Sequence, residues 1–269
     1  MKNLKILSLV TLFISAIISS CSPDSTNEIT AEATDSTLLA RKGQNLLWDP
    51  DLVATVHNNG LEYIYNDFEN IPNTSQNDTN SFLASKAREF VLEQGLDSKY
   101  SENVPAITDF DISNFENSIA SNYSSSFSYE YFYLKNLMID DKKSLSDKIL
   151  SLSNYTPTRT FNDDLEYTMI ITMAKVGKAS LEYWKDKGGE WQNSLNNSQA
   201  KFNWGAIGIS DAGGAVTAAA GLWASGTGAA MIAAAGPGGA VGVGLVIAGG
   251  AIGSSATAFF AQAVTGGWW

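Results

Sequence analysis

The last 58 residues of the chain, Ala212 to Trp269, contain no charged side chain, and this feature constrains the fold more than any other. Asp211 is the last charged residue before the segment, which is composed mainly of small and aliphatic residues. Because so little of such a segment favours contact with water, it must bury itself in a protein core or in a lipid bilayer.

A glycine- and proline-rich sequence divides this segment into two apolar runs, one before and one after it. We predict a turn between antiparallel helices there, because glycine and proline are the residues that most often interrupt a helix. The turn residues are Gly236, Pro237, Gly238 and Gly239. At about 1.5 Å per residue, each run is long enough to cross ~30 Å of hydrocarbon.

The two runs differ in their tendency to enter lipid. Leu, Ile, Phe and Val each contribute roughly −0.3 to −0.6 kcal/mol to insertion, so the first run gains only about −1 to −2 kcal/mol and the second about −3 to −5 kcal/mol. The second run can therefore insert alone, whereas the first is marginal.

Small and aromatic residues in this region follow patterns typical of membrane helices. Glycine or alanine recurs at four-residue spacing, which allows two helix backbones to approach closely. The predicted packing residues are Gly214, Ala218, Gly238, Gly242, Gly249 and Gly253. Tryptophans prefer the membrane interface, and the predicted interface residues are Trp204, Trp223, Trp268 and Trp269.

On these residues, the segment from Trp204 to Trp269 resembles the glycine zippers of membrane-active bacteriocins and the Ala/Gly-rich hydrophobic hairpin of pore-forming colicins. The resemblance implies membrane insertion, with a pore-forming or antimicrobial role as its more specific form. The alternative is a binding or structural protein whose tail packs on its own domain, or self-associates, without entering lipid.

The N-terminus resembles a bacterial lipoprotein signal peptide. Lys2 and Lys5 precede an apolar run of about 13 residues, a length typical of a cleaved signal and short for a membrane span. The run ends in Ile18-Ser19-Ser20-Cys21, which resembles a lipobox and implies cleavage between Ser20 and Cys21, with lipid on Cys21. Ser22 after the cysteine favours the outer membrane by resemblance to the lipoprotein sorting rule.

Composition divides the chain into four parts: a signal peptide (1–20), a polar lipidated tether (21–44), a helical soluble domain (45–203) and the glycine-zipper hairpin (204–269). The tether has too few large apolar residues to form a core. With Cys21 as the only cysteine, the mature chain has no internal disulfide.

Apolar residues in the soluble domain recur at spacings of three and four, so we predict a mainly α fold. The clearest helix begins near Thr160 and is expected to end at Gly188-Gly189. Further helices are predicted from Asp49 or Asp51 to Phe68, and over 81–94, 112–120 and 144–153. The aromatic stretch 124–136 fits a strand or a helix, and we interpret it as a helix because no partner strand is visible.

Charge argues against nucleic acid as a partner. Residues 21–140 carry 19 acidic and 6 basic residues, and residues 141–211 carry 9 of each. Nucleic-acid binding requires a basic surface that neutralises phosphates. Membrane lipid and a second copy of the chain are the partners that the sequence suggests.

The sequence favours a protein that is not an enzyme. The only histidine, His57, shares an apolar helical stripe with Val53 and Leu61, which predicts a packed core histidine. Metal sites with several His or Cys ligands are excluded by count, and no nucleotide- or cofactor-binding motif is present. The carboxylate pairs Asp109/Asp111 and Asp163/Asp164 are interpreted as surface or helix-start residues.

Overall fold

The computed structural model describes residues 44–71, 75–104, 112–195 and 202–265, all within one compact unit that spans residues 42–269. Across these ranges the protein is helical and without strands, which confirms the predicted mainly α fold. Ser20, Cys21 and nearly all of the predicted tether lie outside the described residues, as do Trp268 and Trp269.

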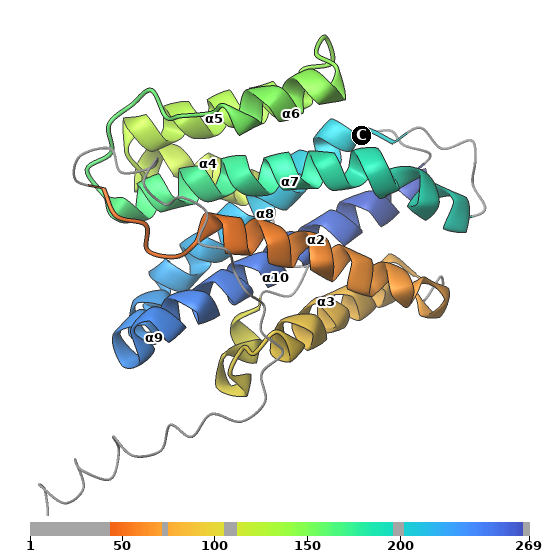
Figure 1. Cartoon of the computed structure of the whole chain (residues 1–269), viewed down its shortest axis with the longest axis horizontal. Coiled ribbons are helices and arrows are strands. Elements are labelled where there is room, and N and C mark those ends of the chain that lie inside the picture. Colours follow the sequence, from red (N-terminus) through yellow and green to blue (C-terminus); the bar gives the residue numbers. More distant parts are fainter. Residues whose placement is uncertain (1–43, 72–74, 105–111, 196–201, 266–269) are drawn as a thin grey trace, which may run out of the picture. The chain divides into compact units, whose positions relative to one another are not determined.

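The helices follow one another with short connections (Figure 1). The first group is α2 (Pro50–Asn66), η2 (Phe68–Asn70), α3 (Gln76–Glu93), η3 (Ser98–Asn103), α4 (Ile112–Asn122), α5 (Ser125–Ile139) and α6 (Leu145–Ser153). The second group is α7 (Asp164–Ser194), α8 (Trp204–Ala224), α9 (Thr227–Ala235) and α10 (Pro237–Thr265). The aromatic stretch is thus a helix, as predicted.

Polar residues just before the helices explain where many of them start. The side chain accepts a hydrogen bond from a backbone N–H of the first turn, and so satisfies a donor that has no partner inside the helix. These N-cap residues are Asp49 for α2, Ser75 for α3, Ser124 for α5, Ser144 for α6, Asp163 for α7 and Asn203 for α8. Ser75 starts α3 five residues earlier than apolar periodicity predicts.

The prediction that the long helix ends at Gly188-Gly189 is wrong, because α7 continues to Ser194. Tertiary packing explains the difference. A Cβ atom at Gly188 would lie 2.6 Å from Cη2 of the Trp204 indole, so the missing side chain makes room for that ring. Trp191, on the continuing turn, is fully buried and contributes to the core. Burial of this kind outweighs the low helix propensity of glycine.

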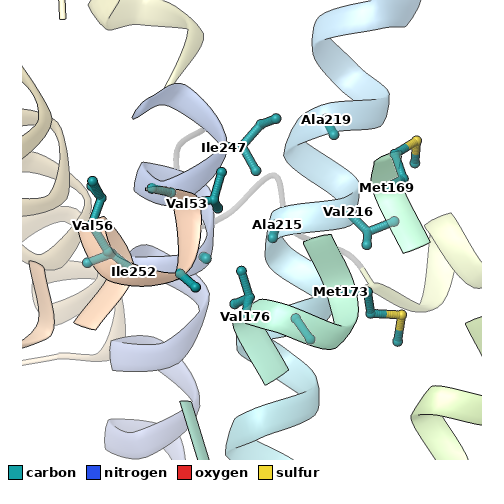
Figure 2. Close-up of a cluster of buried hydrophobic side chains, with 14 of the residues drawn as sticks. Val53, Val56, Met169, Met173, Val176, Ala215, Val216, Ala219, Ile247 and Ile252 are labelled. Atoms are coloured by element: carbon teal, nitrogen blue, oxygen red, sulfur yellow. The ribbon is translucent and has the colours of Figure 1, made fainter. Parts of the chain in front are cut away.

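Helix α10 lies in the interior, in contact with α2, α3, α8 and α9. Helix α7 packs on α2 and α8, and the α5 and α6 helices lie on the far side of α7 from α3 (Figure 1). Figure 2 shows the shared core, in which aliphatic side chains of four helices meet. Its members include Val53 (α2), Val176 (α7), Val216 (α8) and Ile252 (α10), all fully buried.

Candidate functional site: a buried apolar hairpin and its polar contacts

Helix α10 of the apolar C-terminal segment is largely enclosed by other helices, whereas most residues of α9 are exposed. Residues Pro237–Ala263 of α10 are long and apolar enough to cross a membrane, yet 89% of their most apolar window is buried. We call α8, α9 and α10 together the hairpin, and we call α2, α3 and α7, which pack against it, the surrounding helices. An apolar helix of this length can equally be the core helix of a soluble protein, so its surroundings decide how it is interpreted.

The first apolar run is two helices rather than one. Helices α8 and α9 meet at an angle of 78°, with Ser225 and Gly226 between them. Gly226 has a φ of 75°, a left-handed conformation that few residues other than glycine adopt readily. The Ser225 hydroxyl donates to the carbonyl of Leu222 at 3.1 Å, which helps to close the end of α8.

The turn between the runs is shorter than the four residues predicted. Gly236 alone connects α9 to α10, with a φ of 54°, and Pro237 already begins α10. Proline suits the first helical position because it has no N–H group to leave unpaired. Gly238 and Gly239 belong to the first turn of α10, and a Cβ at Gly239 would overlap the backbone of Met231 in α9.

The predicted packing glycines contact several different helices. A Cβ at Gly214 in α8 would lie 2.6 Å from Cβ of Ser254 in α10, so these two helices approach closely there. Gly249 faces Val104, which follows η3, and Gly242 faces the Met231 side chain of α9.

The other three predicted packing residues differ in their surroundings: one has open space and two are buried. A Cβ at Gly238 would have no neighbour within 4 Å. Ala218 and Gly253 are both buried. The single zipper face suggested by spacing is therefore split among separate interfaces.

The two described interface tryptophans pack on protein side chains. Trp204 stacks on Trp184 with ring centroids 5.6 Å apart and on Phe202 at 5.2 Å. Trp223 lies 5.1 Å from Trp48, which precedes α2. Both rings are partly buried in this arrangement.

A buried polar cluster connects the hairpin to the surrounding helices. The Asp211 carboxylate of α8 is fully buried, and its Oδ2 atom accepts hydrogen bonds from Ser180 Oγ and from Trp184 Nε1, the latter at 3.3 Å. His57 Nε2 of α2 lies 3.3 Å from the same oxygen. Burying a carboxylate is costly unless such partners compensate for the lost water.

Asn58 fixes the histidine. Its Oδ1 lies 2.9 Å from His57 Nδ1, and its Nδ2 donates to the carbonyl of Ala179 in α7 at 3.1 Å. We call the group of His57, Asn58, Ser180, Trp184 and Asp211 the Asp211 network. The sequence placed His57 in the core, where it is fully buried. The sequence did not predict the contact with Asp211. The available signal was that Asp211 is the last charged residue before the apolar segment and that His57 is the only histidine of the chain.

The hairpin also buries hydroxyl groups. Ser254 Oγ and Ser255 Oγ of α10 have no hydrogen-bond partner among the described residues, and neither do Thr217 Oγ1 of α8 and Thr257 Oγ1 of α10. Buried hydroxyls normally find a partner. These four groups therefore remain available to bond with another molecule if the hairpin changes its environment.

No grouping of three or more metal-binding side chains occurs in the part of the chain that the structure describes. Asp163 and Asp164 cap and begin α7, so their interpretation as helix-start residues is confirmed. Asp109 and Asp111 lie outside the described residues.

The comparisons with known proteins leave the function to be inferred from these residues: the chain matches no protein-family model, no curated protein and no solved structure.

Proposed function

We propose that the protein is a lipid-anchored protein of the bacterial cell envelope, attached through Cys21 at the outer membrane, whose hairpin enters a membrane. The observation that carries the proposal is helix α10, an uncharged helix long enough to cross a bilayer that is stored inside a shell of other helices. Enclosure would keep the helix soluble once the exported chain has folded, and release would make it available to lipid.

The pairing of α8 with α10 supports insertion as a unit. Gly214 allows the two backbones to approach closely at Ser254, and small residues are what bring helices together in lipid, where the hydrophobic effect no longer does so. Helix α8 is marginal alone, so its partner would supply most of the free energy of insertion.

The more specific form of the proposal is a pore-forming or antimicrobial protein without enzymatic activity. The buried hydroxyls of Ser254, Ser255, Thr217 and Thr257 lack partners in the folded chain. In lipid, such groups favour hydrogen bonds to neighbouring helices. Self-association of several hairpins would satisfy them and place a polar surface between the copies.

One observation favours a second candidate function. Helix α10 contacts α2 and α3 as well as its partners in the hairpin, and it is as deeply buried as an ordinary core helix. On this alternative, the protein is a binding or structural lipoprotein whose tail completes its own core.

Environment-sensitive dyes on the full chain distinguish the two candidates. The Cys21→Ala protein lacks both the lipid and any other cysteine, so a single cysteine can be placed at Val241 in α10, where the side chain is 48% exposed. A matched cysteine at Leu150 in α6, also exposed, serves as the control.

On vesicles of three parts phosphatidylcholine to one part phosphatidylglycerol, we expect the dye at position 241 to shift to shorter wavelength and to be quenched by lipid-attached quenchers. The dye at position 150 should stay in water, and an entrapped dye should be released if pores form. If the dye at 241 also stays in water and the protein does not sediment with the vesicles, the second candidate is correct.

A further inference from the structure

The Asp211 network is the polar connection between the hairpin and the surrounding helices, and its composition is asymmetric. Asp211 belongs to the hairpin, whereas its three contacting side chains, His57, Ser180 and Trp184, belong to α2 and α7. All four residues are buried in the described structure. Any movement of α8 away from α2 and α7 must therefore separate a buried carboxylate from all of its partners at once.

The network also holds the surrounding helices in register. Asn58 contacts His57 within α2 and donates to the Ala179 carbonyl of α7, next to Ser180. Three helices thus meet at one point: directional hydrogen bonds join α2 to α7 and α7 to α8, and His57 Nε2 of α2 lies 3.3 Å from the Asp211 carboxylate of α8. Apolar contacts such as that of Gly249 with Val104 lack this directionality, because dispersion and the hydrophobic effect depend little on orientation.

The position of Asp211 fits a release step. It lies in the second turn of α8, and every residue after it is uncharged. A hairpin that enters lipid from residue 212 onward would leave this carboxylate at the aqueous border, where it could be hydrated. The charge therefore opposes departure from the bundle without opposing the inserted state.

We propose that the Asp211 network is a latch that retains the hairpin in the bundle, and that loss of its contacts is the step that frees α8 and α10. The latch concerns the folded chain in water, and its role in membrane entry rests on the function proposed above.

Hydrogen–deuterium exchange of the full Cys21→Ala chain tests the latch directly. We expect Asp211→Asn to increase the exchange rate of α8 and α10 at least tenfold, because an amide has only one acceptor oxygen and its NH₂ group cannot accept from Ser180 and Trp184, while α5 and α6 exchange as in the parent protein. Ser180→Ala removes one hydrogen-bond donor to Asp211 and should give a smaller increase in the exchange rate of α8 and α10. This variant tests the latch even if Asp211→Asn does not fold.

Glu130→Gln is the matched control. Glu130 is a fully buried carboxylate of α5 that accepts hydrogen bonds from Tyr155, Thr158 and the Arg159 backbone, none of which belongs to the hairpin. Its substitution should increase exchange around α5 and residues 154–159 and leave α10 unchanged.

Unchanged or slower exchange of α8 and α10 in Asp211→Asn would overturn the latch, as would an equal increase in every helix. The wavelength shift of the dye at position 241 on the vesicles defined above reports separately on the proposed function. Faster exchange without that shift in any variant would retain the latch and reject membrane entry. The shift with unchanged exchange would reject the latch and retain membrane entry.

Discussion

Single glycines decide how closely the long helices approach one another. Gly188 and Gly189 are neighbours in α7, but Gly188 lies under the Trp204 ring and Gly189 faces solvent with no heavy atom within 4 Å of a Cβ built on it. The same residue type therefore has opposite roles at adjacent positions. One glycine provides space, and the other only weakens the helix.

The two alanine substitutions should have opposite effects on stability. Gly188→Ala is expected to lower the free energy of unfolding by about 1–3 kcal/mol, because the stacked Trp204 indole cannot move aside without losing its contacts. Gly189→Ala should raise it by about 0.5–1 kcal/mol through the better helix propensity of alanine. Urea denaturation followed by circular dichroism measures both. Equal effects of the two substitutions would show that Trp204 does not pack on α7 as described.

At the scale of elements, the α8–α10 pair is the most extensive contact within the hairpin. Gly214 in α8 lies against Ser254 and against the Gly250 carbonyl of α10, whereas Gly221, two turns further along α8, has open space around it. The pair therefore depends on one small residue, and not on the glycine content of α8 as a whole.

We expect Gly214→Ala to lower the free energy of unfolding by about 1–3 kcal/mol, because Ser254 is short and the two backbones must separate to admit a methyl group. Gly221→Ala is the control, and should stabilise the protein by about 0.5–1 kcal/mol. Thermal and urea unfolding test the pair. A neutral Gly214→Ala would mean that α8 and α10 do not approach at this point.

An ion-pair cluster connects the end of α2 to α3. Lys86 Nζ lies 2.9 Å from Asp67 and 3.0 Å from Glu89. The hydrogen bonds from Lys86 hold the pKa of both carboxyl groups below their usual range, and those from Asp67 and Glu89 raise the pKa of Lys86. A carboxyl group with a lowered pKa stabilises the fold above its ordinary pKa, and this contribution is lost as the pH falls through the lowered value.

Lys86→Met should therefore reduce the thermal unfolding midpoint slightly at neutral pH, with the difference from the parent protein disappearing in acid once both carboxyl groups are protonated. Lys185→Met, on an exposed turn of α7 and without an ion pair to any described residue, should show no such pH dependence. Melting curves across the acid range make the comparison. If the unfolding midpoint of Lys86→Met differed from that of the parent protein by the same amount at all pH values, the effect would come from packing of the lysine methylene groups and not from the ion pairs.

For the whole molecule, the central fact is that α10, a helix long and apolar enough to cross a membrane, lies inside the bundle in contact with α2, α3, α8 and α9. This arrangement is compatible both with a stored membrane segment and with a permanent core. The dye experiment at Val241 tests whether α10 enters a membrane. The exchange experiment tests whether the Asp211 network retains the hairpin in the bundle.

The sequence alone determined the helical fold, the starts of α2, α4, α5 and α6 to within about a residue, and the uncharged character of the C-terminal segment. It could do so because capping residues, apolar periodicity and the lack of charge act over a few residues, as at Ser144, Asp163 and the His57 stripe.

Only the tertiary structure decided that α7 continues through Gly188, that α8 and α9 are separate helices, and that His57 lies beside Asp211. The physical reason is distance along the chain. Trp204 fills the space at Gly188 from another helix, and Asp211 follows His57 by more than 150 residues, so no local pattern in the sequence contains either contact.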